Sequence, residues 1–272
     1  MKRIAAIIFA VMLAGIAAAS PAHWAAFDDH YFAARTVEVG PTISNLVAHW
    51  KMNDNAADKI VLDSFGDYHG TNIANTADKS VAGKINTALD FDGVNDYVTI
   101  SSTGIWDTLG NTSNALTFAC WYYSASGATG DRGLFSKGND PRMMSFGFVD
   151  SGMHLAFLCK NGSDGNALWV NATTNYGVNC PTQWVHYAVT YDGSRVTNGV
   201  VLYINGSVVG MYGRFNSLAG VATNASPFMI GHLYNSSTRA KGRIDDMRVY
   251  DRVLSSNEIA IIYNAGSGTE EE

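Results

Sequence analysis

Short apolar runs separated by turn residues dominate the sequence from residue 46 to residue 250. Gly, Asn and Asp cluster between nearly all of these runs, a pattern typical of strands joined by tight turns. Residues 184–191 alternate apolar and polar side chains, as a strand with one buried face does. No long stretch has helical periodicity, which argues against a parallel βαβ sheet and favours an all-β sandwich or jelly roll. The expected strands are 46–50, 88–91, 97–100, 116–123, 133–137, 144–149, 154–159, 167–171, 184–191, 200–204, 229–232 and 243–250.

Turn and cap signals predict several local features. The turn at residues 92–96 lies between two expected strands and predicts a hairpin, and Asn205-Gly206 predicts a second one. Ser255 and Glu258 have the spacing of a capping box, which predicts one short C-terminal helix. Residues 266–272 are small and acidic, so we expect a disordered tail there.

The N-terminal residues resemble an export signal. Lys2 and Arg3 precede an almost wholly apolar run that ends at Ala19, as in a cleaved secretory signal peptide. A membrane anchor is the alternative, but the run is shorter than the roughly 20 residues that a spanning helix needs. We therefore expect a signal peptide over 1–19, a leader or extension over 20–45, and a secreted protein, extracellular or periplasmic.

The charge of the chain limits its partners. The formal net charge is −6, and no cluster of Lys and Arg is present. Nucleic-acid binding and attraction to anionic lipid both depend on such clusters, so we expect neither a nucleic-acid partner nor membrane insertion.

Three cysteines are present, and export permits a disulfide. Cys120 lies in an apolar run, where a buried free thiol behaves as a small hydrophobe. We expect a bridge between Cys159 and Cys180, which would close a loop rich in Asn and Gly.

Seven sequence blocks, in this order, resemble the LamG-like jellyroll domain of the concanavalin A-like lectin/glucanase superfamily. Each block is weak alone, and the order carries the resemblance, which extends over a domain at 46–265. It implies a two-sheet antiparallel jelly-roll sandwich of six or seven strands a sheet, to which the capping box at Ser255 adds one short C-terminal helix. The blocks are 48–54, 62–70, 88–98, 116–121, 184–193, 202–206 and 242–255.

The acidic residues argue against an enzyme of the glucanase type. Glycosidases need paired carboxyl groups, and the glucanase relatives carry them as Glu-x-Asp-x-Glu on one strand. The chain has no such motif, and no Glu lies on an expected strand. A Gly-x-Ser-x-Gly nucleophile elbow is absent as well. We therefore expect a protein that is not an enzyme.

The resemblance also implies a structural calcium ion, which would be bound near Asp54, Gly93 and Asp245. Carboxylate and carbonyl oxygens are the ligands that calcium prefers. The alternative is that Asp54 caps a turn and that Asp245 pairs with Arg243 or Arg248.

Carbohydrate ligands are held by aromatic faces together with amides and charged groups. Such residues in or beside the expected loops are the candidate ligand-binding set, and a solvated loop is the alternative for each. The set is Trp106, Asn139, Asp140, Arg142, Trp169, Tyr234 and Arg239.

The sequence thus predicts a secreted binding or adhesion module that recognises a polysaccharide, a glycoconjugate or another cell-surface ligand. Two alternatives remain open. One is a structural protein that assembles with its own copies through exposed strand edges, as a homo-oligomer. The other is a polysaccharide hydrolase or lyase with a different set of acids.

Overall fold

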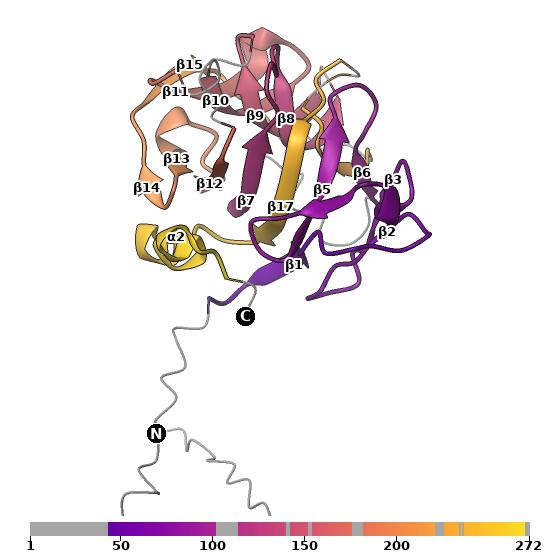
Figure 1. Ribbon diagram of the computed structural model, residues 1–272. Helices are drawn as coiled ribbons and strands as arrows, with labels where there is room; N and C mark the ends of the chain where they lie inside the picture. The colour runs from indigo at the N-terminus through magenta and orange to yellow at the C-terminus, as the bar shows by residue number, and fades with distance from the viewer. Residues whose placement is uncertain are drawn as a thin grey trace, which may run out of the picture. The chain divides into compact units, whose positions relative to one another are not determined.

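Two antiparallel sheets form the core architecture of the computed structural model (Figure 1). The structure describes residues 43–101, 114–139, 142–151, 154–175, 182–220, 226–233, 235 and 237–269, without the side chains of Asn139, Arg142 and Met143.

The first sheet has the long strand β17 near its centre, flanked by β7 and β5, and these three lie side by side in Figure 1. Strand β1 (Leu46–Trp50) also pairs with β17. The path of the sheet is β14 (Ser207–Val208), β13 (Val200–Ile204), β12 (Trp184–Tyr191), β7 (Leu116–Ser124), β17 (Lys241–Tyr250), β5 (Thr87–Asp92) and β4 (Ser80–Ala82).

The second sheet is the wider of the two, with nine strands among the described residues. Its strands, in order, are β15 (Met211–Asn216), β11 (Ala167–Ala172), β10 (His154–Asn161), β9 (Arg142–Val149), β8 (Arg132–Asn139), β16 (Phe228–Ile230), β6 (Val98–Ile100), β3 (Gly70–Asn72) and β2 (Ile60–Val61). Short 3-10 turns lie at Thr76–Asp78, Asp164–Asn166, Thr197–Gly199 and Asn264–Gly266.

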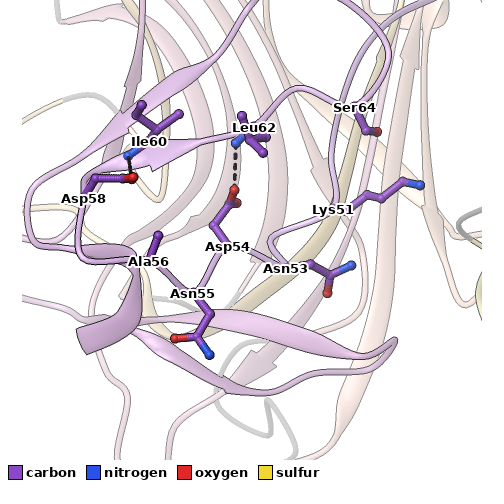
Figure 2. A pocket seen from close by; sticks show the side chains of 9 residues that line it. All are labelled: Lys51, Asn53, Asp54, Asn55, Ala56, Asp58, Ile60, Leu62 and Ser64. Carbon is purple, nitrogen blue, oxygen red and sulfur yellow. Dashed lines mark hydrogen bonds between the residues drawn. The ribbon is translucent and has the colours of Figure 1, made fainter.

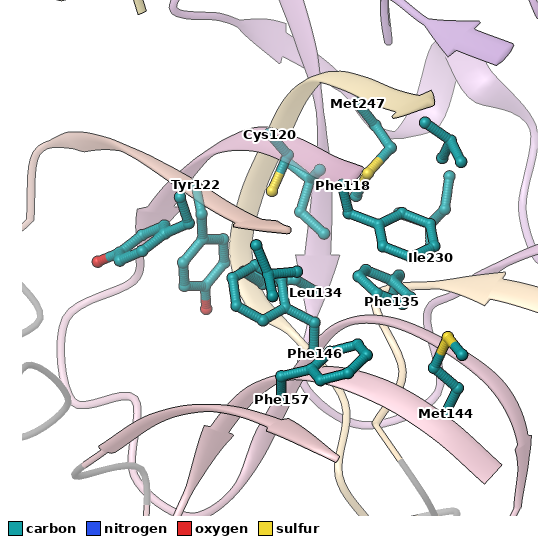
Figure 3. Close-up of a cluster of buried hydrophobic side chains, with 14 of the residues drawn as sticks. Phe118, Cys120, Tyr122, Leu134, Phe135, Met144, Phe146, Phe157, Ile230 and Met247 are labelled. Carbon is teal, nitrogen blue, oxygen red and sulfur yellow. The ribbon is translucent and has the colours of Figure 1, made fainter. Parts of the chain in front are cut away.

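The inner faces of the sheets meet in one hydrophobic core. Phe118, Cys120 and Tyr122 of β7 belong to this core, whereas the residues between them face outward, as strand alternation requires. Figure 3 shows these side chains close to Phe135 and Phe146 of the second sheet. The two-sheet jelly-roll sandwich that the sequence predicts is therefore confirmed.

The hairpin predicted at residues 92–96 is wrong. Strand β5 pairs with β4 and β17, whereas β6 pairs with β3 and β16 of the other sheet. Asp92 Oδ1 accepts hydrogen bonds from the amides of Val94 and Asn95, at 2.7 and 3.0 Å. The turn chemistry is thus as expected, but the turn carries the chain from one sheet to the other. The hairpin at Asn205-Gly206 is confirmed, because Ile204 of β13 pairs with Ser207 of β14.

Five strands were not predicted from the sequence, and the sheets are wider than the resemblance implies. Four of them have two or three residues, too few to show alternation. The missed strands are β2, β3, β4, β14 and β15.

The predicted C-terminal helix is α2 (Ser256–Tyr263), and its capping box between Ser255 and Glu258 is present. Ile259 and Ile262 are buried in a second apolar cluster, which also contains Ala119, Ala188, Tyr203 and Tyr250. The helix therefore covers part of the outer face of the first sheet. Beyond the helix, Arg248 donates a hydrogen bond to the carbonyl of Thr269. The disordered tail over residues 266–272 stays a prediction.

Two paired glycines let the loop that contains His232 and Leu233 cross the outer face of the second sheet. Gly133 of β8 lies opposite Gly147 of β9. A Cβ atom on Gly133 would lie 1.8 Å from the carbonyl carbon of His232, and one on Gly147 would lie 2.9 Å from Cδ1 of Leu233. Leu233 then packs with Val149, Ala156 and Leu158.

The structure does not show the predicted disulfide at Cys159. Its side chain is buried in the core between the sheets as a free thiol, and burial raises the pKa of that thiol. Cys180 lies outside the described residues. Cys120 is a buried free thiol, as predicted.

Among the described residues, no helix has the length and apolar character needed to cross a membrane.

Replacing Gly133 with Ala tests whether the loop at His232 crosses the sheet directly over Gly133. The new methyl group meets backbone atoms of His232, which cannot rotate away. We expect the variant to lose about 1–3 kcal/mol in free energy of unfolding by urea titration, the usual effect of overpacking. Gly165→Ala is the matched control, because its Cβ would meet only Ser163 Oγ, at 3.7 Å. If the two variants are equally stable, the backbone of His232 does not pack closely on Gly133.

His186 makes folding sensitive to acid. It is fully buried, neither ring nitrogen has a hydrogen-bond partner among the described residues, and burial lowers its pKa to about 4. The unfolded chain binds a proton below about pH 6.5, whereas the folded protein does not until near pH 4, so stability falls as the pH drops through this window.

We expect the wild type to lose roughly 2 kcal/mol in free energy of unfolding between pH 7.5 and pH 5 because of His186. His186→Gln removes this titration and should have a flatter pH profile in urea titrations. Parallel profiles for the two proteins would show that His186 is not responsible.

Candidate functional site

One end of the outer face of the second sheet carries a cluster of aromatic, amide and charged side chains. Leu168, Val170 and Ala172 of β11 face the core, so Trp169 and Asn171 point outward. The neighbouring strand β15, the turn after β9 and the first residue of β10 complete the cluster, which we call the Trp169 platform. It consists of Asp150, His154, Trp169, Asn171, Tyr212 and Arg214.

A β-bulge in β15 brings Arg214 over Trp169. Val170 pairs with Gly213 and Trp169 pairs with Phe215, which leaves Arg214 as the extra residue. Bulges of this kind redirect a side chain. The guanidinium carbon of Arg214 lies 4.3 Å from the centre of the Trp169 ring and 6.0 Å from that of Phe215. Such a cation–π contact holds the guanidinium against the aromatic ring.

Asn171 holds the platform together. Its side chain is fully buried, and Trp169 Nε1 donates to its Oδ1. Its Nδ2 donates to Asp150 Oδ2 at 3.2 Å and to the hydroxyl oxygen of Tyr212 at 3.0 Å. Arg214 Nη1 donates to the other carboxylate oxygen of Asp150 at 2.6 Å. Each polar side chain is therefore held by another before any ligand arrives, which is the preorganisation that recognition needs.

The platform is accessible to solvent. Tyr212 is 42% exposed, and the side chains of Arg214 and Asp150 are 39% and 29% exposed. His154 packs edge-on against Tyr212, with ring centres 6.1 Å apart, and its Nδ1 lies 3.0 Å from the carbonyl of Ala172. The platform thus presents an aromatic ring, a guanidinium and a carboxylate on one surface.

Two hollows lie elsewhere on the described surface. One, of about 730 Å³, is lined by Lys59, His69, Thr71, Asn72, Ile73, Thr99, Ser101 and Pro227. The other, of about 420 Å³, follows β1 and is shown in Figure 2. Its two carboxylates are engaged with backbone amides, since Asp54 accepts from Leu62 and Asp58 accepts from Ile60. Neither hollow contains Phe, Trp or Tyr among these lining residues.

Of the predicted ligand-binding residues, the structure brings Trp169 into the platform. Arg239 lies apart from it, with its guanidinium 4.4 Å from the centre of the Tyr97 ring, and burial lowers its pKa. Asn139 and Arg142 are the paired residues at the ends of β8 and β9, and their side chains are not described. Trp106, Asp140 and Tyr234 lie outside the described residues.

The predicted calcium ligands lie in three different settings. Asp54 is in the hollow of Figure 2, and burial raises its pKa. Gly93 is in the turn after β5, with φ of 77°. Asp245 is buried on β17, and its Oδ2 accepts from the amides of Lys84 and Ile85 at 2.7 and 2.9 Å. Within the described part of the chain, no group of three His, Cys, Asp or Glu side chains is arranged to hold an ion. Calcium binding stays a prediction.

The sequence alone did not identify five residues of the platform, namely Asp150, His154, Asn171, Tyr212 and Arg214. Strand β15 has no uninterrupted alternation because of its bulge, and the Asp150–Arg214 ion pair joins residues 64 positions apart. The aromatic and charged residues of Met211–Asn216 were the available signal.

The chain belongs to the concanavalin A-like lectin/glucanases superfamily, since the Laminin_G_3 family model matches residues 92–260. A comparison with curated proteins found no match.

Solved structures share the fold. Domain 4 of AbnA, an extracellular arabinanase from Geobacillus stearothermophilus solved with arabinotriose, has a TM-score of 0.54 at 23% identity, over 80% of this chain and 97% of that one. The binding domain of Paraclostridial Mosquitocidal Protein 1 has a TM-score of 0.53 at 14% identity, over 79% and 53%. Trypanosoma rangeli sialidase with sialic acid has a TM-score of 0.56 at 15% identity, over 85% of this chain but only 34% of the sialidase.

Calorimetric unfolding with calcium and with a chelator tests the predicted metal ligands. If calcium binds at Asp54, it should raise the unfolding midpoint of the wild type, because an ion bound only by the folded state stabilises that state. Asp54→Asn should remove the shift. A wild-type midpoint that is the same in both buffers would contradict calcium binding.

Proposed function

We propose that this protein is an exported, non-catalytic module that binds a carbohydrate on the Trp169 platform. The observation that carries the proposal is the solvent-accessible, preorganised set of Tyr212, Arg214 and Asp150 on one sheet face, with the half-buried Trp169 in contact with Arg214. Aromatic rings supply apolar contact to the C–H faces of sugars, and planar charged groups orient hydroxyls.

Membership of a superfamily of lectins and glucanases supports a carbohydrate ligand. The arabinanase domain that shares the fold was solved with arabinotriose, which supports the same class. Export is supported by the signal-like N-terminal sequence.

A binding role rather than hydrolysis is supported by the platform's acids. Glycoside hydrolysis requires two carboxyl groups that flank the scissile bond. The platform contributes one, Asp150, which is already held by Arg214 and Asn171. Glu258, the glutamate in the described part of the chain, pairs with Arg252 at 2.5 Å beside helix α2.

Tyr212→Ala tests the location of binding. On a glycan array, we expect the variant to lose roughly tenfold or more in affinity for any glycan that the wild type retains, because an interfacial aromatic contributes about 1.5–3 kcal/mol. Phe65→Ala is the matched control, since Phe65 is 52% exposed at a distant site beyond β2. It should bind as the wild type does.

Three results would contradict the proposal: no glycan retained by the wild type, unchanged binding by Tyr212→Ala, or release of reducing ends from a bound glycan. A sizing column run on each protein separates loss of binding from a change in self-association, the structural alternative.

A further inference from the structure

We infer that the Trp169 platform selects a neutral sugar with two adjacent free hydroxyl groups. This inference rests on the proposed function and names its ligand class. It follows from two observations on the Asp150–Arg214 pair, one of charge and one of hydrogen-bonding capacity.

The platform carries no net charge to attract an acidic sugar. Its one guanidinium, on Arg214, is paired with the carboxylate of Asp150 at 2.6 Å. The chain as a whole has a formal net charge of −6. A carboxylated sugar that reached Arg214 would have to displace Asp150 or lie beside it, and like charges in contact are unfavourable. Charge therefore favours a neutral ligand.

The hydrogen bonds inside the platform leave some donors and acceptors available to a ligand. A carboxylate accepts about four hydrogen bonds, and Asp150 uses two of them, for Arg214 and Asn171. A guanidinium offers about five N–H groups, and the bond to Asp150 uses one of those on Arg214. The hydroxyl of Tyr212 accepts from Asn171, so its own proton is free to be donated.

These remaining groups match adjacent hydroxyls. A hydroxyl both donates and accepts, and two of them on neighbouring carbons can accept from Arg214 while donating to Asp150. A sugar carboxylate in their place has no proton to donate and would leave the acceptors of Asp150 without donors, and unpaired polar groups at an interface lower affinity. Asn171 has both ends of its amide engaged within the platform, so it positions the others.

Arg239 does not change this conclusion. Its guanidinium lies over Tyr97, and its Nε and Nη1 atoms are shielded from solvent. It therefore does not present an open planar fork to an acidic sugar.

Asp150→Asn tests the inference on an array that carries neutral, carboxylated and sulfated glycans. We expect the wild type to retain neutral glycans with adjacent free hydroxyls over their carboxylated counterparts. The variant loses the paired carboxylate and leaves the charge of Arg214 uncompensated. It should bind those neutral glycans roughly tenfold more weakly and gain affinity for carboxylated ones.

Asp164→Asn is the matched control, because Asp164 pairs with Lys160 at 2.7 Å in another ion pair on the surface. It should leave the array profile unchanged. Arg214→Lys keeps the charge but removes the planar fork, and should lose neutral binding as well. Thermal unfolding of each variant checks that it is folded. If Asp150→Asn does not fold, the binding of Arg214→Lys decides the outcome.

The outcomes separate the inference from the proposed function. Stronger wild-type binding of carboxylated or sulfated glycans than of neutral ones would overturn the inference while leaving carbohydrate binding intact. The inference would also be overturned if Asp150→Asn or Arg214→Lys is folded and binds neutral glycans as tightly as the wild type does. If no glycan of any class is retained by the wild type, the proposed function fails, and the inference with it.

Discussion

Aromatic contact between the two sheets is the interaction on which the rest of the structure depends. Phe118 from the first sheet lies against Phe135 and Phe228 from the second, and Trp50 stacks on Phe228 with ring centres 6.0 Å apart. Once these rings face inward, strand alternation determines which residues face outward. On the first sheet, helix α2 covers part of that outer face. On the second sheet, the outer face at β11 and β15 remains accessible, and the Trp169 platform lies there.

Much of the fold could be predicted from the sequence. The bounds of strand β12 (Trp184–Tyr191) are those expected, although residues 185–191 are buried on both faces and not on one face alone. The capping box at Ser255 and Glu258 predicted helix α2 correctly. The strand pattern and the capping box are both local signals, so they can be read without knowledge of the tertiary structure. The hairpin at residues 92–96 failed because a turn signal specifies a change of direction and not which sheet receives the next strand. The burial of Cys159 was not visible in the sequence either, since it depends on packing from the other sheet.

The site was less predictable than the fold. Trp169 was found because an aromatic residue beside a polar loop is visible in the sequence. Arg214 was not, because its position depends on a bulge that shifts the register of β15 against β11. Asn171 reads as a polar residue on a strand, and its role depends on three partners from three segments of the chain. Contacts of this kind arise from the assembled sheet and leave no short-range pattern.

Amide hydrogen exchange with and without a bound glycan tests most directly whether function resides on this outer face. We expect slower exchange on binding in residues 150–151, 167–172 and 211–216, where the platform and its supporting strands lie. Exchange in residues 54–62 and in helix α2 should not change. Protection confined to the hollow around Asp54 and Asp58, with none in β11 or β15, would rule out binding on the Trp169 platform and place the site at the other end of the sheet.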